Sequence, residues 1–544
     1  MKGGEMRIFK TVMREIPENL LSVFFVNTLS AVAATSIVGI VSAATKEAAN
    51  GKISGRLLLM FAISILLFHV TQIHTLVTSS IDSERLIHKL RIRLFNLVRK
   101  TDLVTIDRIG RANVQGVLTQ DTQILAEVLP MLVIGFQHAI ILVFLAIYLA
   151  WLSPLACVLA FGLAGLTVSV RFKRVHSLRA LMQSAASAEG RVFDGLTELL
   201  NGFKEVRMNG PRADGVINTL REASHTSRTT NSLLKAQWGR NYAIIEAMLY
   251  SLAGLIVFVV PLFVDGFFQV ALPATIAVLF IAGPVSTVSF VTPMLTQAEL
   301  ALENIETMEK NLSAAAEAAS CEETGRLEND TLSIALHEAT LSYRDTSGSP
   351  LFSVGPLNAE FKAGQITFIT GGNGSGKSTL LRLLTGLIPL DSGSVLTNGI
   401  PVTTEQMQDY RNRISAIFSD FHLSRRLYSI KDPDPVKIST LLERLEMHDM
   451  VWVCNGSFST LDLSTGQRKR LALIVAELED KQVIVLDEWA ADQDPHFRRI
   501  FYEELLPDLK ARGKIVISVT HDDRWFHLAD RIYKMNEGRI EEQL

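Results

Sequence analysis

The stretch that decides the fold is Gly371-Gly-Asn-Gly-Ser-Gly-Lys-Ser378. It fits the pattern G-x-x-x-x-G-K-[ST], in which glycines let the backbone wrap closely around phosphate oxygens. Residues 365–370 before it are typical of a strand, and residues 379–385 after it are typical of a helix. A chance glycine-rich turn lacks this setting, so we interpret the stretch as a phosphate-binding loop between strand and helix.

Each position of this loop has an expected task. The N-terminus of the following helix would direct free N–H groups and its positive dipole end at the phosphates. Lys377 would reach the β- and γ-phosphates of ATP, and Ser378 would hold Mg²⁺. The remaining loop positions predicted to contact the nucleotide are Gly371, Asn373, Gly374, Gly376 and Thr379.

Two further strands end in residues that suit nucleotide hydrolysis. The aliphatic run 483–488 ends in Asp487 and Glu488. A buried strand would deliver Asp487 to the Mg²⁺ shell, and Glu488 could polarise the water that attacks the γ-phosphate. His521 follows the run 514–520 and could hydrogen-bond the γ-phosphate. Taken alone, His521 would be an ordinary surface histidine; its place after a second strand favours the catalytic role.

The rest of the chain has a different composition. Of its 544 residues, 48% are hydrophobic and only 20% are charged, which is less charge than soluble domains carry. The apolar excess lies in the first ~300 residues as long runs, which indicates membrane spans. The net charge of −3 does not favour nucleic-acid binding, and the three cysteines show no metal-ligand or disulfide spacing.

Six apolar segments are long enough to cross a bilayer as helices. They are residues 20–44, 57–79, 128–151, 154–170, 242–264 and 268–293, of which the fourth is the weakest because a tight turn separates it from the third. The long connections 80–127 and 171–241 are rich in Arg and Lys, so both, together with the two termini, are predicted to be cytosolic. Residues 1–19 are interpreted as a cytosolic lead-in.

Both long connections have helical periodicity, so the spans are expected to extend as helices into the cytosol. They would turn near residues 101–111 and 197–206, either as contact helices for a soluble domain or as plain solvated helices. Polar residues inside the spans suggest a polar substrate pathway or hydrogen bonds between helices. These residues are Asn27, His69, Gln72, Gln137, His138 and Glu246, with inter-helix bonding favoured for Asn27 and His69.

The predicted fold class is therefore a polytopic α-helical membrane domain with six transmembrane helices of exporter type, fused to an α/β P-loop ATP-binding cassette. The membrane domain spans residues 1–310, an Ala-, Ser- and Glu-rich linker spans 311–330, and the cassette spans 331–544. The first, helical part of the linker is expected to continue the sixth span.

The segment Leu463-Ser-Thr-Gly-Gln467, followed by Arg468-Lys-Arg470, resembles the signature sequence of ATP-binding cassette (ABC) proteins. The resemblance implies that Tyr343 stacks on adenine and that Asp494 is the aspartate of the D-loop. It also implies that Ser464, Gly466 and Gln467 contact the ATP held by a partner chain. Six spans before one cassette is the layout of an exporter-type half-transporter.

Several cassette segments are similar to the cyclic-peptide exporters, a group that includes exporters linked to syringomycin-type lipopeptides and to the siderophore pyoverdine. These segments are residues 352–357, 370–377, 418–423 and 486–498. The resemblance implies ATP-driven export of a cyclic peptide, lipopeptide or peptide siderophore precursor across a bacterial inner membrane. One position departs from most cassettes: Ser419, followed by Asp420, stands where a glutamine is usual, and neither is assigned a catalytic role.

In the family, two cassettes pack head to tail around ATP, which implies a dimer. Because no catalytic position is degraded here, a symmetric homodimer is predicted, embedded in membrane lipid and without a nucleic-acid partner. Two alternatives remain: a lipid flippase of the same architecture, and a non-transporting regulator that uses ATP as a switch. An importer is less favoured, because importers usually carry spans and cassette on separate chains.

Overall fold

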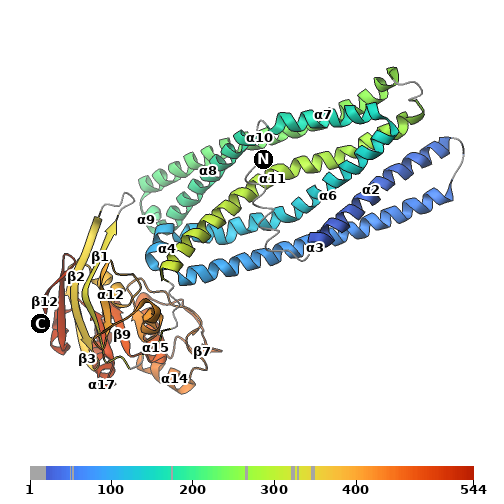
Figure 1. Cartoon of the computed structure of the whole chain (residues 1–544). Coiled ribbons are helices and arrows are strands. Elements are labelled where there is room, and N and C mark those ends of the chain that lie inside the picture. The colour runs from blue at the N-terminus through green and yellow to red at the C-terminus, as the bar shows by residue number, and fades with distance from the viewer. Residues whose placement is uncertain are drawn as a thin grey trace. The chain divides into compact units, whose positions relative to one another are not determined.

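The computed structural model describes residues 20–49, 51, 54–172, 175–263, 268–319, 325–327, 330–344 and 350–543. The predicted lead-in 1–19 and part of the predicted linker lie outside these residues. The chain divides into two compact units, each described here by itself (Figure 1). The first unit comprises the residues up to Asn96 and Ala112–Lys310, and the second comprises Leu97–Arg111 and Asn311–Leu544.

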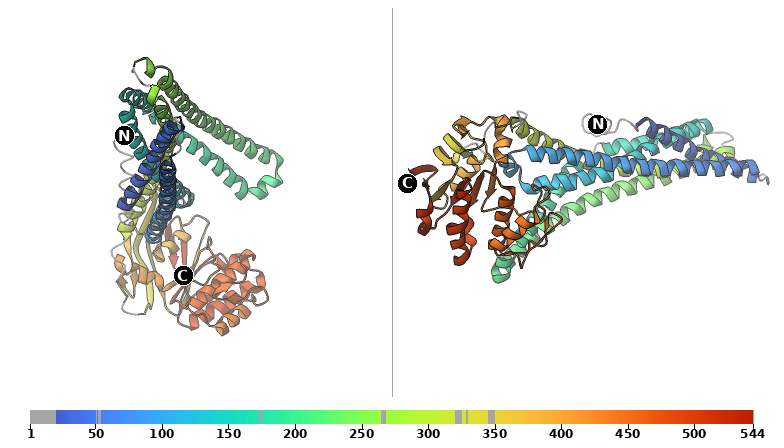
Figure 2. Two further views of the ribbon diagram at one scale, coloured as in Figure 1. Left: turned by 90° about the vertical axis from the view of Figure 1, so that its right-hand side faces the viewer. Right: turned by 90° about the horizontal axis from the view of Figure 1, so that it is seen from below.

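The first unit consists of helices. They are α2 (Leu20–Ala49), α3 (Gly55–Lys100), α5 (Arg111–Gly116), η1 (Val117–Asp121), α6 (Thr122–Leu152), α7 (Pro154–Phe172), α8 (Val175–Asn201), α9 (Phe203–Met208), α10 (Gly210–Phe258), η2 (Val260–Leu262) and α11 (Phe268–Ala319). Helices α8 and α10 run side by side, as do α2 and α6 (Figure 1, Figure 2). As predicted, α11 continues the sixth span into the helical part of the linker.

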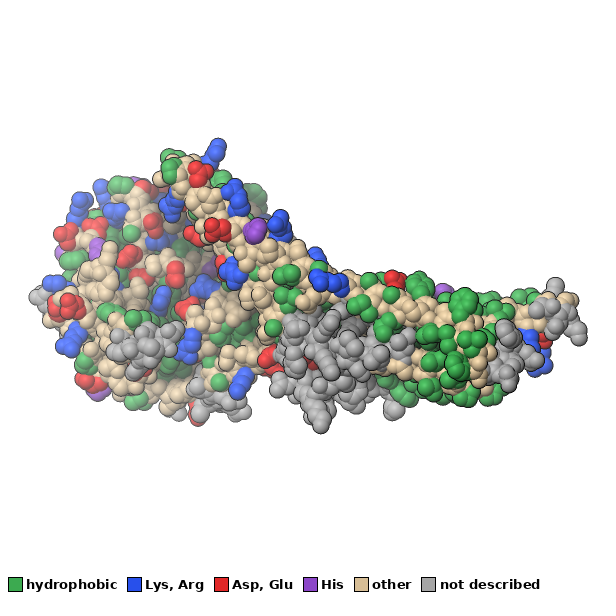
Figure 3. Space-filling view, turned by 90° about the horizontal axis from the view of Figure 1, so that it is seen from above, with side chains coloured by type: hydrophobic (Ala, Val, Ile, Leu, Met, Phe, Trp, Pro, Cys, Tyr) green, Lys and Arg blue, Asp and Glu red, His purple; other side chains and the backbone are tan. Residues whose placement is uncertain are grey.

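Among the described residues, five helical segments are long and apolar enough to cross a membrane. They are Ser22–Ala48, Gly55–Lys100, Arg111–Leu152, Gly210–Leu262 and Ala271–Ala315, which overlap the first, second, third, fifth and sixth predicted spans, respectively. The weakest predicted span, the fourth, corresponds to α7 and is not among the five. Hydrophobic side chains gather along this unit, whereas charged side chains are spread over the other (Figure 3). The chain is thus a multi-pass membrane protein.

Small side chains let the spans pack closely. Ala31 of α2, Ala156 of α7 and Ala274 of α11 are fully buried in one cluster that also includes Leu145 and Ile256. Such residues let helix backbones approach within a lipid environment, where the hydrophobic effect does not drive association. The spans therefore form a packed bundle rather than independent helices.

Buried hydrogen bonds also join the spans. The Gln137 side chain of α6 donates from Nε2 to Ser30 Oγ of α2 and to Gln72 Oε1 of α3, at 2.7 Å each. Thr75 donates to Asn27 Oδ1 at 3.2 Å. Inter-helix bonding is thus confirmed for Asn27, whereas His69 is exposed and Glu246 accepts a hydrogen bond from Tyr242 one turn before it on the same helix.

The helices turn at both predicted places. Helix α3 ends at Lys100 and is followed by the short α4 (Leu103–Ile109), in which Asp102 caps the first turn by accepting from Thr105 N at 2.8 Å. Helices α8, α9 and α10 make the second turn. The α4 segment belongs to the second unit, where Val104 packs against the hydrophobic core, so the first turning point is a contact helix.

The second unit is an α/β domain built on two main sheets (Figure 1). Its strands are β1 (Ser333–Arg344), β2 (Pro350–Lys362), β3 (Gln365–Gly371), β4 (Ser392–Thr397), β5 (Ile400–Pro401), β6 (Ile414–Ile417), β7 (Val453–Cys454), β8 (Ser457–Phe458), β9 (Val483–Asp487), β10 (Ile515–Val519), β11 (Arg531–Asn536) and β12 (Arg539–Gln543). One sheet has the order β2-β1-β4-β5, the other β12-β11-β3-β10-β9-β6, and β7 pairs with β8.

Helices cover these sheets. They are α12 (Lys377–Leu384), η3 (Thr404–Gln406), α13 (Met407–Asn412), α14 (Pro435–Arg444), α15 (Thr465–Glu479), η4 (Trp489–Asp492), α16 (Pro495–Ile500), η5 (Phe501–Leu505), α17 (Leu506–Ala511) and η6 (Asp523–Leu528). Four leucines of α12 share one core with residues of both sheets. In the larger sheet, β6, β9, β10, β3 and β11 run parallel. Their carboxyl ends therefore meet at one edge, where ligands bind in open α/β sheets.

Candidate nucleotide-binding and hydrolysis site

The predicted phosphate loop lies between β3 and α12, as the sequence indicates. Gly371 has φ 143°, and a Cβ built on it would lie 2.3 Å from the Met535 carbonyl oxygen. Only glycine fits there, because any side chain would clash with the neighbouring strand. Gly371, Asn373, Gly374 and Gly376 all belong to this loop, which leads directly into the first turn of α12.

Lys377 points back into the loop. Its Nζ donates to the carbonyl oxygens of Gly371 and Gly372 at 3.0 and 2.9 Å, and the side chain is buried. The ammonium group thus lies inside the concave loop, where phosphate oxygens could replace the two carbonyl partners. Ser375 in the same loop is buried, and its hydroxyl has no hydrogen-bond partner among the described residues. An unpaired buried hydroxyl in such a loop fits a phosphate ligand.

Oxygen groups suited to Mg²⁺ meet beside the loop. Ser378 Oγ donates to Asp487 Oδ2 at 3.3 Å, and Ser419 N donates to the same oxygen at 3.4 Å. Burial raises the pKa of Asp487, and the Glu488 charge raises it further, while the Ser419 and Ser378 hydrogen bonds oppose the shift. A divalent cation would favour the ionised carboxylate, so this oxygen pair fits Mg²⁺.

Ser419 contacts the predicted Mg²⁺ ligand Asp487 through its backbone. Its N–H donates to the Asp487 carboxylate, a contact that needs no glutamine side chain. Asp420 instead forms an ion pair with Arg382 of α12 at 3.8 Å.

Glu488 follows β9 in a left-handed conformation, with φ 50° and ψ 38°. Its carboxylate oxygen Oε1 lies 3.3 Å from Nε2 of His521, which follows β10. The side chains of Glu488 and His521 keep 37% and 48% of their surface exposed, so water and a phosphate can reach both. The two predicted catalytic residues on neighbouring strands are thus side by side.

Tyr343 lies near the start of α12. Its hydroxyl group is 3.5 Å from Oγ1 of Thr379, one residue after the predicted metal ligand Ser378. The aromatic ring of Tyr343 is half-buried at the end of β1, close to the phosphate loop. This position suits the predicted stacking on adenine.

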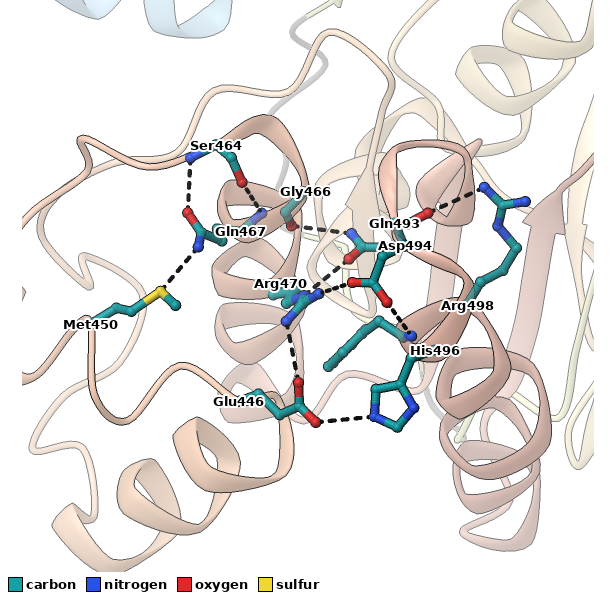
Figure 4. Close-up of polar contacts among 11 residues, drawn as sticks. Glu446, Met450, Ser464, Gly466, Gln467, Arg470, Gln493, Asp494, His496 and Arg498 are labelled. Atoms are coloured by element: carbon teal, nitrogen blue, oxygen red, sulfur yellow. Dashed lines mark hydrogen bonds and ion pairs between the residues drawn. The ribbon is translucent and has the colours of Figure 1, made fainter.

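The signature segment opens α15. Ser464 caps the helix and Gln467 completes a capping box, with Gln467 N to Ser464 Oγ at 3.3 Å and Ser464 N to Gln467 Oε1 at 3.0 Å (Figure 4). This cap explains Ser and Gln at these two positions without any ligand. Ser464 is exposed, and Gly466 and Gln467 in the first turn of α15 are half-buried, so this signature loop at the start of the helix can meet another surface.

Asp494 lies next to this helix rather than next to the phosphate loop. It caps α16 by accepting from Phe497 N at 2.9 Å and pairs with Arg470 at 2.8 Å (Figure 4). The Phe497 N–H bond, with help from the Arg470 charge, holds the pKa of Asp494 below its usual value. The contact of Asp494 with nucleotide therefore remains a prediction, and it would require the nucleotide site of a second chain.

Some residues of the site lie in recognised stretches, but the sequence assigns them no role. Lys469 and Gln493 are both buried and link α15 to the turn after Glu488, and Trp489 of that turn is fully buried. Only the bulky Trp489 in a run of small and polar residues hints at special packing there. A buried lysine or glutamine could be identified only once the helix and the turn were known to be neighbours.

Comparisons with known proteins agree with this geometry. A family model described as ABC transporter matches residues 354–491. The ATP-binding protein SyrD of Pseudomonas syringae pv. syringae is 35% identical over 480 residues, covering 84% of this chain and 83% of SyrD. The energy-coupling factor transporter ATP-binding protein EcfA1 of Oenococcus oeni is 29% identical over 214 residues, covering 37% of this chain and 75% of EcfA1.

A solved structure is similar over nearly the whole chain. The structure of a bacterial Atm1-family ABC exporter with ATP bound superposes with a TM-score of 0.75 and covers 97% of this chain and 95% of that one. The two sequences are only 16% identical, so this likeness shows the fold alone. It includes the membrane helices as well as the nucleotide-binding unit.

Proposed function

The chain belongs to the ABC transporter family as an exporter-type half-transporter that couples ATP hydrolysis to transport, and on that premise we propose that two identical copies export a peptide-like molecule. The proposed cargo is a cyclic peptide, a lipopeptide or a peptide siderophore precursor. The proposed location is the bacterial inner membrane, with both termini cytosolic.

The observation that carries the homodimer is the complete hydrolytic set on one chain. Lys377, Asp487, Glu488 and His521 are all present, and the last three lie at one edge of the parallel sheet. A half-transporter supplies six spans and one cassette, so a second chain must complete the pathway. Because this chain degrades none of its catalytic positions, a second copy of itself supplies two equivalent sites.

In this dimer, each ATP is held between one chain's phosphate loop and the other chain's signature loop. Lys377 and the loop N–H groups bind the phosphates, and Ser378 with Asp487 would hold Mg²⁺, which neutralises phosphate charge. Glu488 accepts a proton from the attacking water as the oxygen of that water bonds to the γ-phosphorus. The bond from that phosphorus to the β-γ bridging oxygen breaks, leaving ADP and phosphate. His521 orients Glu488 and contacts the γ-phosphate.

Transport follows from the different affinities of ATP for the two arrangements of the dimer. Ser464 and Gly466 of the partner copy add contacts to the γ-phosphate only when the cassettes are closed. ATP therefore favours the closed state, and hydrolysis removes that preference. The membrane helices change the side on which their cavity opens as the cassettes close and separate.

The peptide class of the cargo is supported by the similarity of cassette segments to the cyclic-peptide exporters. The test uses proteoliposomes, in which ATP added outside reaches only the transporters whose cassettes face outward. We expect cyclic lipopeptides to stimulate ATPase activity and to accumulate inside vesicles with outward cassettes, and Glu488→Gln vesicles to accumulate none. Movement of labelled phospholipid without peptide uptake would favour the flippase, and ATPase activity without any cargo movement would favour the regulator.

A further inference from the structure

We propose that Lys469 and Gln493 are positioning residues that lock the signature helix α15 to the turn carrying Glu488. The signature loop serves the ATP held by the partner copy, whereas Glu488 serves the ATP of its own chain. The lock would therefore couple the two ATP sites of the dimer. This inference rests on the proposed homodimer and gives Lys469 and Gln493 roles that the sequence resemblance does not assign to them.

The backbone of Glu488 needs support. A left-handed conformation is unfavourable for a residue with a side chain and persists only when its surroundings hold it in place. Here the Glu488 N–H donates to the Val519 carbonyl at 3.2 Å, and the Glu488 carbonyl accepts from Lys469 Nζ at 2.7 Å. The proposed base is thus fixed from the neighbouring strand on one side and from α15 on the other.

Lys469 is an unusual residue for this place. Its side chain is only 3% exposed, and its Nζ also pairs with Asp492 Oδ2 at 2.7 Å. Buried ammonium groups are costly unless they are paired and hydrogen-bonded, and Lys469 meets both requirements with partners from one turn. In return, Trp489 Nε1 of that turn donates to the Lys469 carbonyl at 2.9 Å. Helix and turn therefore hold each other in both directions.

Gln493 makes the second connection, to the signature loop itself. Its Nε2 donates to the Gly466 carbonyl at 3.1 Å, and its Oε1 accepts from Arg470 Nε at 3.0 Å (Figure 4). A Cβ on Gly466 would lie 2.6 Å from the Asp492 carbonyl oxygen, so the loop and the turn touch backbone to backbone. Gln493 is 5% exposed, so little water reaches its side chain.

These contacts join the signature loop and the turn after Glu488 into one rigid unit. A displacement of the signature loop towards the partner's ATP would be passed through Gln493 and Lys469 to the backbone of Glu488. Catalytic groups are sensitive to such displacements, because an error of about 1 Å can lower a rate about a hundredfold. Binding of ATP at one site would then set the position of the base at the other.

The test of Lys469 uses the full-length protein in nanodiscs, with ATPase kinetics and ATP affinity measured separately. We expect Lys469→Met to lower kcat about tenfold to a hundredfold while the Kd for ATP stays within about twofold. Lys469→Arg, which keeps a donor for both partners, should restore part of kcat. Unchanged kcat in Lys469→Met would overturn the role of Lys469. If Lys469→Met does not fold, Lys469→Gln decides by the same kcat comparison.

The chain offers a matched control in Lys514. Its Nζ bonds the carbonyl and the carboxylate of Asp480, which is also left-handed with φ 51°. Asp480 lies at the other end of α15, away from the signature loop. Lys514→Met should lose stability without a specific loss of kcat. An equal loss of kcat in both lysine variants at matched thermal stability would overturn the proposed role.

The test of Gln493 is cooperativity between the two ATP sites. We expect wild-type ATPase activity to have a Hill coefficient above 1 and Gln493→Leu to bring it towards 1 with unchanged Kd. A Hill coefficient equal in both proteins would overturn the coupling. Glu488→Gln separates this inference from the proposed function. Full ATPase activity in Glu488→Gln would overturn the proposed function itself. Lost activity in Glu488→Gln together with wild-type kinetics in Lys469→Met and Gln493→Leu would overturn only the lock.

Discussion

The nucleotide-binding unit and the membrane unit of this chain differ in how their polar residues are encoded. The proposed ATP site is made of short contiguous stretches, such as 371–378 and the pair Asp487 and Glu488, because one loop wraps one phosphate chain. The buried polar side chains of the membrane unit come singly from α2, α3 and α6, as Asn27, Thr75 and Gln137 show. A site built from neighbouring residues is recognisable as a sequence motif, whereas a hydrogen-bond network between distant helices is not.

The largest expected effect lies in the nucleotide-binding unit. Glu488→Gln removes the proton acceptor but keeps the shape of the side chain, so we expect kcat for ATP to fall about 10²- to 10⁴-fold. ATP binding should persist, so the variant should trap MgATP. The measurement is steady-state phosphate release together with retained nucleotide after gel filtration. Undiminished turnover would remove Glu488 from the mechanism.

The next effect concerns binding rather than hydrolysis. Lys377→Ala removes the ammonium group that lies inside the phosphate loop, and charged hydrogen bonds of this kind contribute about 1.5–3 kcal/mol. We therefore expect the Kd for ATP to rise about tenfold to a hundredfold, measured with a fluorescent ATP analogue and competition by ATP. Lys481→Ala, which changes a lysine outside the loop, is the control and should bind normally. Equal affinity in both variants would contradict the assignment of the loop.

Much of this unit could be predicted from the sequence, because β3, β9 and β10 bring the ends of three recognisable runs to one edge. Lys469 and Gln493 could not be predicted, because their roles depend on the packing of α15 against the turn after β9. In the membrane unit, the sequence predicts the spans by length and apolarity, but not that Gln137 faces both Ser30 and Gln72. A hydropathy pattern contains no information about which faces of the helices meet.

A smaller effect is expected on stability. Burial raises the pKa of Asp487, so the folded state binds the proton of the Asp487 carboxyl group more tightly than the unfolded chain does. Stability should therefore fall as pH rises above about 3.8 through the raised pKa, and Asp487→Asn should relieve this cost at pH 7. We expect the nucleotide-free variant to unfold at a higher temperature than the wild type, with the difference shrinking towards pH 4.

The measurement is thermal unfolding by intrinsic fluorescence across that pH range. Asp449→Asn serves as the control, because the Asp449 side chain is 85% exposed and does not line the site. A stabilisation of the same size in both variants would show that burial of Asp487 is not the cause.

The smallest effect is expected in the membrane unit. Gln137→Leu removes two inter-helix hydrogen bonds, and such bonds contribute about 0.6 kcal/mol each in membrane proteins. We expect a small drop in thermal stability and basal ATPase activity within about twofold of wild type. Gln123→Leu, on the exposed face of the same helix, should change neither. A loss of ATPase activity as large as that of Glu488→Gln would erase the contrast between the two units.

The most direct test of the shared ATP sites is the mass of the Glu488→Gln protein in detergent with and without MgATP, measured by light scattering coupled to gel filtration. With MgATP we expect a species of twice the chain mass of 60.1 kDa that retains two ATP molecules, one at each shared site. A protein that stays a single 60.1 kDa chain with ATP bound would contradict it.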